Sequence, residues 1–248
     1  MTELPPNIAD VVARLSRMTG VVAVVLGGSR AAGTATERSD WDLGVYYRGA
    51  VDTTLLSELG QVHPPGSWGR VMNGGAWLTV AGAKVDVLLR DLDVVEHWCR
   101  RAEEGEYEVD ALLGYIAGIP TYSLLAERAV AVPLVGALVA IVGFPAKLAA
   151  AAPPRWRFHA EFSLAHARMR AEHGDVVGAV GHVAKAVVES AHAVLCARGV
   201  WQLNEKQIVD AARLASMHDR LASVPHRPDE LVQWTRKAAD ALGFPSPR

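Results

Sequence analysis

The chain has 248 residues, of which 50% are hydrophobic and 21% charged, and its formal net charge at pH 7 is −2. This composition is typical of a globular protein with one large or two modest domains, and the charge argues against nucleic-acid binding through neutralised phosphates. The two cysteines, Cys99 and Cys196, lie far apart without metal-ligand spacing. We therefore expect reduced thiols in a cytoplasmic protein and no disulfide framework.

The N-terminal part of the chain begins with a helix and a strand. Apolar residues from Ile8 to Met18 recur with the helical period, and Gly20 follows where a helix would end. The run 21–26, VVAVVL, has the pattern of a buried strand. Gly27-Gly28-Ser29 comes directly after it. A glycine turn after a strand lets the backbone approach an anion closely, and the serine adds a hydroxyl donor.

A second strand is predicted over residues 40–47, eleven residues after Ser29. Side chains two residues apart in a strand point to the same face, so Asp40 and Asp42 would present their carboxylates together. Carboxylate oxygens are hard ligands suited to Mg²⁺. Without the glycine turn, the same pair would be interpreted as a solvated strand face.

The rest of this half predicts a short helix, a long loop, a hairpin and a further helix, over 53–59, 61–75, 76–89 and 91–104 respectively. Asp86 lies in the second strand of the hairpin, between Val85 and Val87. Its side chain would leave the face that these two valines share. The alternatives are an exposed strand acid and a third acid of the same site.

Beyond about residue 105 the strand patterns stop and helical patterns follow. Helices are predicted over 108–118, 123–131, 134–142, 156–173, 176–198, 206–217 and 228–242. A mixed sheet flanked by helices, followed by an all-helical bundle, predicts an α+β fold. We place the domains at 1–110 and 111–248.

The segment 129–146 contains no charged residue and approaches the lower length limit of a membrane span. Pro133, Gly136, Gly143 and Pro145 interrupt it. We therefore expect a buried helix rather than a membrane segment. An interface in a homodimer is left open as a further use of this apolar stretch.

The hydrophobic strand, the Gly-Gly-Ser turn and the sequence Asp40-Trp41-Asp42 resemble the signature of the DNA-polymerase-β-like nucleotidyltransferases, whose third carboxylate corresponds to Asp86. The resemblance covers roughly residues 7–100. It implies that Asp40, Asp42 and Asp86 are catalytic and bind two Mg²⁺ ions, with a nucleoside triphosphate as co-substrate. It also implies that the turn holds the phosphates.

Four further side chains are candidate ligands of the nucleotide. Arg30 and Arg38 are cationic candidates for the phosphates, although Arg38 has the alternative of pairing with a nearby carboxylate. Ser39 is a nucleotide contact or a local hydrogen-bonding residue. Lys185 reaches the triphosphate or forms a surface ion pair with Glu189, four residues later.

The helical half resembles, more loosely, the second domain of small-molecule nucleotidyltransferases. This resemblance implies transfer of a nucleoside monophosphate, AMP in the first instance, to a hydroxyl of a small molecule such as an aminoglycoside-type antibiotic. The alternative is an antitoxin-like or regulatory protein of the same fold that modifies or binds a partner protein. Neither a nucleic-acid partner nor a membrane partner is expected.

Overall fold

The computed structural model describes residues 4–37 and 39–244. The chain forms two compact units, and each contains two separate stretches of sequence. The first unit is the chain up to Arg101 together with Thr121–Gly143, and the second is Ala102–Pro120 together with the chain from Phe144 onward. The division predicted from sequence has a single cut at residue 110, whereas the observed units interleave. We describe each unit by itself.

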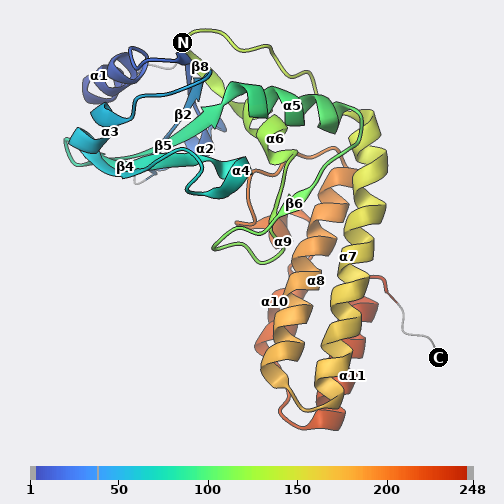
Figure 1. The fold of residues 1–248 in the computed structure, drawn as a ribbon. Coiled ribbons are helices and arrows are strands. Elements are labelled where there is room, and N and C mark those ends of the chain that lie inside the picture. Colours follow the sequence, from blue (N-terminus) through green and yellow to red (C-terminus); the bar gives the residue numbers. More distant parts are fainter. Residues whose placement is uncertain (1–3, 38, 245–248) are drawn as a thin grey trace. The chain divides into compact units, whose positions relative to one another are not determined.

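The first unit is built on a six-stranded mixed sheet, which the ribbon shows beside its covering helices (Figure 1). Only β2 and β5 run parallel, and the other neighbouring pairs are antiparallel. The order is β3 (Gly60–His63), β4 (Gly74–Val80), β5 (Ala83–Asp91), β2 (Trp41–Tyr47), β1 (Val21–Leu26) and β8 (Val132–Val135).

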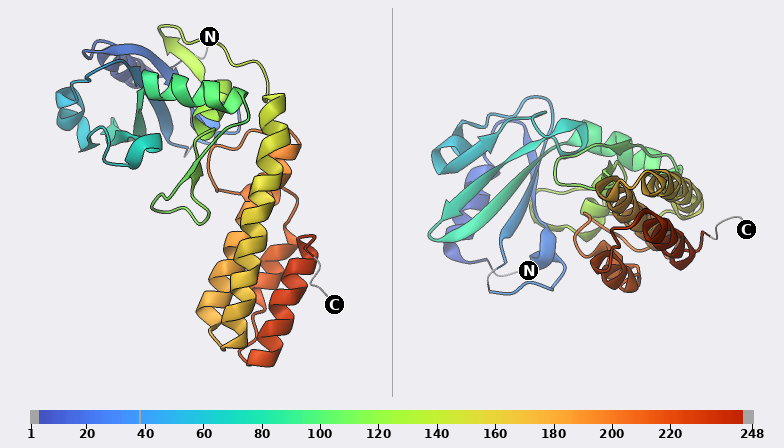
Figure 2. Two further views of the ribbon diagram at one scale, coloured as in Figure 1. Left: turned by 45° about the vertical axis from the view of Figure 1, so that its right-hand side comes forward. Right: turned by 90° about the horizontal axis from the view of Figure 1, so that it is seen from below.

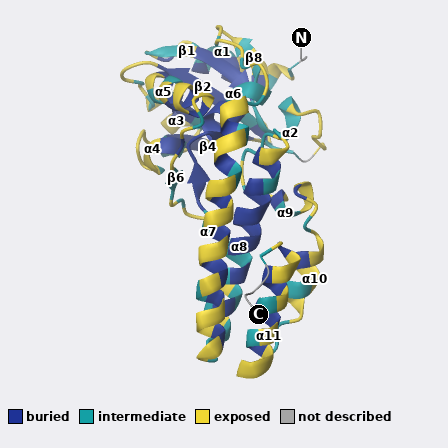
Figure 3. Cartoon of the chain, turned by 90° about the vertical axis from the view of Figure 1, so that its right-hand side faces the viewer, coloured by how far each residue is buried: buried dark blue, intermediate teal, exposed yellow. Residues whose placement is uncertain are grey.

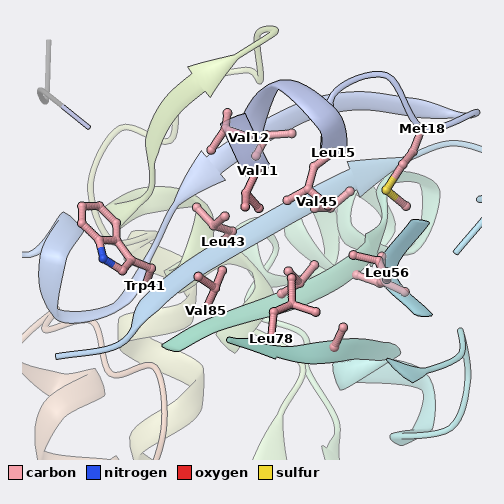
Figure 4. Close-up of a cluster of buried hydrophobic side chains, with 14 of the residues drawn as sticks. Val11, Val12, Leu15, Met18, Trp41, Leu43, Val45, Leu56, Leu78 and Val85 are labelled. Carbon is pink, nitrogen blue, oxygen red and sulfur yellow. The ribbon is translucent and has the colours of Figure 1, made fainter. Parts of the chain in front are cut away.

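One face of this sheet is covered by α1 (Pro6–Leu15), whose apolar side chains pack on alternate residues of the strands (Figure 4). Leu43 of β2 and Val85 of β5 belong to this core and are fully buried. Each such aliphatic side chain contributes about 1.5–3 kcal/mol of burial free energy. Since side chains alternate along a strand, the residues between the core positions, Asp42 and Asp86, point to the opposite face.

The predicted strand at 21–26, the hairpin and the helices at 53–59 and 91–104 are confirmed as β1, β4–β5, α3 (Thr54–Leu59) and α5 (Leu92–Glu103). The prediction of an irregular loop over 61–75 is wrong, because the segment contains most of β3 and the short helix α4 (Gly69–Met72). Its proline and glycine residues obscured a strand of four residues, which is shorter than periodicity can identify.

The prediction of a buried helix over 134–142 is also wrong. After α6 (Ser123–Val130) the chain forms β8, which pairs with β1 at the edge of the sheet. Gly136 follows with φ +75°, and a Cβ there would lie 2.2 Å from the carbonyl oxygen of Val22, so the chain turns away close against β1. Residues 137–145 have no helix or strand. Within the described residues no helix is long and apolar enough to cross a membrane.

The second unit is mainly helical, and its two longest helices run side by side in all views (Figures 1 and 2). These are α7 (Ala146–Glu172) and α8 (Val176–Ala197), joined by a short turn in which the Asp175 side chain accepts a hydrogen bond of 2.8 Å from the Gly178 N–H. The C-terminal helix α11 (Pro228–Ala241) packs against both. The outer face of α7 is exposed, whereas much of α8 is buried (Figure 3).

Three helix predictions in this unit need correction. The segment 108–118 contains no described helix; β6 (Val109–Asp110) pairs instead with β7 (Ile119–Pro120), and Gly114 and Gly118 between and beside them have positive φ. The segment 206–217 is divided into α9 (Ile208–Ala211) and α10 (Ser216–Ala222) by Arg213, whose φ is +63°. Helix α7 begins ten residues before the predicted start and contains Pro153-Pro154, residues that usually interrupt a helix.

The mixed sheet of the first unit and the long helices of the second confirm the predicted α+β fold. The helices predicted over 176–198 and 228–242 are confirmed as α8 and α11.

Candidate active site

The glycine turn at the end of β1 lies directly against Asp42. The Gly27 N–H donates a hydrogen bond of 2.8 Å to the backbone oxygen of Asp42. Gly28 begins the short helix α2 (Gly28–Ala31) with φ +58°, and a Cβ added there would lie 1.7 Å from Asp42 Oδ2. Only glycine has both the conformation and the absent side chain that this approach needs.

Asp42 and Asp86 are neighbours across the parallel pair β2–β5, where they are direct partners in the register. Adjacent strands are about 4.8 Å apart, so the two carboxylates leave the same face of the sheet as close neighbours. Both residues are half-buried. The sequence could place these two acids on strands, but only the register brings them side by side.

Asp40 lies one residue before β2 begins, near the other two acids. Burial raises the pKa of the Asp86 carboxyl above its usual value, the negative charge of Asp40 raises it further, and the positive charge of Lys84 lowers it. Asp40 is therefore close enough to repel a charge on Asp86. The three predicted acids lie at one end of β2 and β5.

The chemistry of these acids fits a divalent cation, because carboxylate oxygens are the donors that Mg²⁺ prefers. Asp86 is disfavoured as an anion by burial and by Asp40, and a nearby cation would reverse this penalty. In the side-chain conformations observed, no three His, Cys, Asp or Glu residues among 4–37 and 39–244 form a ready metal-binding group.

The Arg30 side chain extends from α2 to the segment that leads to β2. Its Nε donates to the Asp40 carbonyl at 3.2 Å and its Nη2 to the Ser39 carbonyl at 2.6 Å. The guanidinium also lies over the Trp41 ring, 4.1 Å from its centroid. These contacts fix the position of Asp40 relative to α2. In the structure Arg30 thus positions the acidic segment, and its contact with phosphate stays a prediction.

The other nucleotide ligands predicted in this unit are Ser29, Arg38 and Ser39. The Ser39 Oγ accepts a 2.9 Å hydrogen bond from the Thr36 N–H, which is the local bonding considered as its alternative. Ser29 is half-buried in α2, and its carbonyl accepts from the Thr34 N–H at 2.9 Å. Arg38 lies outside the described residues.

Lys185 belongs to the second unit, on α8, and its Nζ lies 3.9 Å from Glu189 Oε1. Glu189 is only 2% exposed, because its face of α8 packs against α7. The alternative of an ion pair at the surface is therefore wrong for Glu189. The Ser163 Oγ of α7 donates to Glu189 Oε2 at 2.8 Å. Burial raises the pKa of Glu189, although the Ser163 hydrogen bond and the charge of Lys185 oppose this shift.

Two features of the first unit were missed at the level of sequence. Arg90 is 1% exposed, and its Nε and Nη2 donate to the two carboxylate oxygens of Glu127 on α6 at 2.7 and 2.6 Å. This ion pair attaches α6 to β5 but takes no part in the acidic site. Trp77 is half-exposed on β4 and is the register partner of Asp86. Trp77 lies between Ala76 and Leu78, which point to the buried face of β4. This alternation is what the sequence offers as a sign that Trp77 points to the other face.

Comparison with known proteins agrees with the signature. Residues 7–105 match the family described as nucleotidyltransferase domain, and no curated protein matches the chain. Among solved structures, a nucleotidyltransferase-like protein from Exiguobacterium sibiricum is similar over 95% of this chain and 73% of its own, with 11% identity and a TM-score of 0.46. An aminoglycoside 6-adenyltransferase from Bacillus subtilis is similar over 97% of this chain and 92% of its own, with 9% identity and a TM-score of 0.29.

These two structural similarities are too weak to bear on the activity. The family match covers the segment in which the glycine turn and the three acids converge. Residues 7–105 therefore form a nucleotidyltransferase domain, as their DNA-polymerase-β-like signature indicates.

Proposed function

We propose that this protein is a Mg²⁺-dependent enzyme that transfers a nucleoside monophosphate, AMP in the first instance, from a nucleoside triphosphate to a hydroxyl group of a small molecule. The observation that carries the proposal is that Gly27, directly after β1, lies against Asp42 of β2, which pairs with Asp86 of β5. The net charge of −2 supports a small acceptor over a nucleic acid. Aminoglycoside-type antibiotics are the first acceptors to test.

Each side chain of this arrangement has a distinct task. The turn holds the β- and γ-phosphates through the backbone N–H groups of Gly28 and Ser29 and the serine hydroxyl, because the Gly27 N–H is bonded to Asp42. Asp40, Asp42 and Asp86 hold two Mg²⁺ ions, which when bound stabilise the attacking and leaving oxygens and the charge on the phosphoryl group. Arg30 keeps the Asp40 segment in place through its bonds to two carbonyls.

The reaction forms a bond between the acceptor oxygen and the α-phosphorus and breaks the bond from that phosphorus to the bridging oxygen of pyrophosphate. The acceptor hydroxyl loses its proton to Asp86 or to a carboxylate of the helical unit.

The test has a binding arm and an activity arm. A nucleoside triphosphate with Mg²⁺ should raise the melting temperature, because a ligand that binds only the folded state stabilises it. Incubation with labelled triphosphates and a panel of hydroxylated antibiotics, followed by mass spectrometry, should then show an acceptor heavier by one nucleotide. Modification of an added protein instead of any small molecule would support the regulatory alternative and refute the proposal.

Asp42→Asn should keep the fold and abolish transfer, and Asp10→Asn is its matched control. Asp10 is exposed on α1, which covers the opposite face of the sheet from the acids. Both variants remove one carboxylate charge without changing size. Retained transfer in Asp42→Asn, or equal loss in Asp10→Asn, would remove the assignment of Asp42 to the site.

A further inference from the structure

We infer that Trp77 forms the acceptor-binding platform of this enzyme and that the acceptor carries a ring that stacks on its indole. This inference rests on the proposed function, because it assigns the side of the acids on which the acceptor binds. It names a substrate class, ring-bearing hydroxyl compounds, that the acidic residues alone do not specify.

Trp77 lies in register with the acidic residues of the sheet. Trp77 pairs with Asp86, and Asp86 pairs with Asp42. The Gly27 N–H in turn bonds the Asp42 carbonyl. Directly paired residues point to the same face and their Cβ atoms are about 5 Å apart. One row therefore runs from the glycine turn after β1 across β2, β5 and β4, and presents two carboxylates and then an indole.

The geometry of phosphoryl transfer determines on which side of the acids the acceptor binds. In an in-line displacement the attacking and leaving oxygens lie on opposite sides of the phosphorus. Pyrophosphate bound at the Gly27–Ser29 end of the row places the acceptor hydroxyl toward the other end. Trp77 is the next residue of the row beyond Asp86, on the side away from the glycine turn. The indole therefore adjoins the acceptor rather than the triphosphate.

The Trp77 indole is held by neighbouring rings and is still accessible to a ligand. The His63 ring meets the Trp77 ring edge to face, with centroids 4.4 Å apart, and the Trp68 ring lies 5.8 Å away. Gly75 makes room for this cluster, because a Cβ there would lie 2.7 Å from a Trp68 ring atom. Trp77 nevertheless remains 50% exposed. A preorganised aromatic face beside a catalytic acid is suited to stacking with a ring.

A fluorine NMR titration tests the platform without requiring turnover. The full chain labelled with 5-fluorotryptophan has seven signals, one for each tryptophan, and the signal lost in Trp77→Phe identifies Trp77. Phenyl β-glucoside should shift this signal in a saturable manner, whereas the acyclic polyol sorbitol should not. No shift with phenyl β-glucoside, or a larger shift with a non-hydrolysable ATP analogue and Mg²⁺ alone, would overturn the inference. A melting temperature that does not rise with nucleotide would refute the proposed function. The titration with phenyl β-glucoside would still decide whether Trp77 binds a ring.

Kinetics provide the second test, with an acceptor that the antibiotic panel shows to be modified. Loss of one stacking contact is expected to raise the acceptor KM about 5-fold to 150-fold in Trp77→Ala, with the triphosphate KM and the melting temperature nearly unchanged. Trp77→Phe should restore most of the affinity. Phe158→Ala removes another exposed aromatic, from α7, and should leave both constants unchanged. A raised triphosphate KM with an unchanged acceptor KM would show that Trp77 stacks on the nucleobase instead.

Discussion

Replacing Gly28 by alanine should separate the stability of the glycine turn from its catalytic purpose. Gly28 has φ +58°, a conformation that costs an alanine about 1–2 kcal/mol. For a chain of this size, that corresponds to a fall in melting temperature of about 2–8 °C. The new Cβ would also lie 1.7 Å from Oδ2 and 2.6 Å from Cγ of Asp42, so the carboxylate must rotate away. A displacement of about 1 Å at a reacting centre costs on the order of 100-fold in rate.

Gly33→Ala is the matched control for this experiment. Gly33 has φ +70°, and a Cβ there would meet no atom within 4 Å. Its alanine variant should lose about the same 1–2 kcal/mol of stability while its transfer activity stays near the parent level. Thermal unfolding and transfer assays on both variants check the two effects separately. An active Gly28→Ala variant, or equal losses of activity in both, would refute the view that this turn positions Asp42.

Three further predictions concern charge and pH. Asp42→Asn should unfold at nearly the parent temperature and show no nucleotidyl transfer; residual transfer would contradict its role. Asp86→Asn should raise the melting temperature of the metal-free protein at pH 7, because the raised pKa of Asp86 means that its charge disfavours the folded state. This gain in melting temperature should vanish as the pH falls below the ordinary aspartate range. A loss of stability at pH 7 would show that burial and Asp40 do not disfavour the charge of Asp86. His192 is buried against Trp156, and burial lowers its pKa from 6.5 to about 3. The unfolded chain therefore binds the His192 proton first, and stability is lost as the pH falls from 6.5 toward 3. His192→Phe should flatten this part of the stability–pH curve, and an unchanged slope would refute the assignment.

The parts of the site that sequence could predict are those set by neighbouring residues. The β-branched run 21–26, the glycine turn and the spacing to Asp40 and Asp42 are local patterns, and the first strand has the predicted bounds. Side-chain alternation also gave the correct face for Asp86. These features depend on backbone conformation and strand period, which a short window of sequence contains.

The features that could not be predicted depend on contacts between distant parts of the chain. The partner of Arg90 is Glu127, 37 residues later, and neither residue has a local sign of burial. Trp77 acquires its place beside Asp86 only through the β4–β5 register. Glu189 has the spacing of a surface ion pair with Lys185, and only the packing of α7 on α8 buries it. In these three cases tertiary packing determines the burial and the partners of a side chain, which the periodicity of the sequence does not indicate.

The return of residues 121–143 to the sheet has a consequence for engineering the catalytic part of this enzyme. A fragment ending near residue 105, where the family match ends, would lack both α6 and β8. The hydrogen-bonding groups of β1 would then form an open edge prone to aggregation, and Arg90 would be left as a buried cation without Glu127, a loss of about 3–5 kcal/mol. Exchanging the helical unit between enzymes to alter acceptor choice therefore needs three junctions, after residues 101, 120 and 143, with 121–143 retained beside the strands it completes.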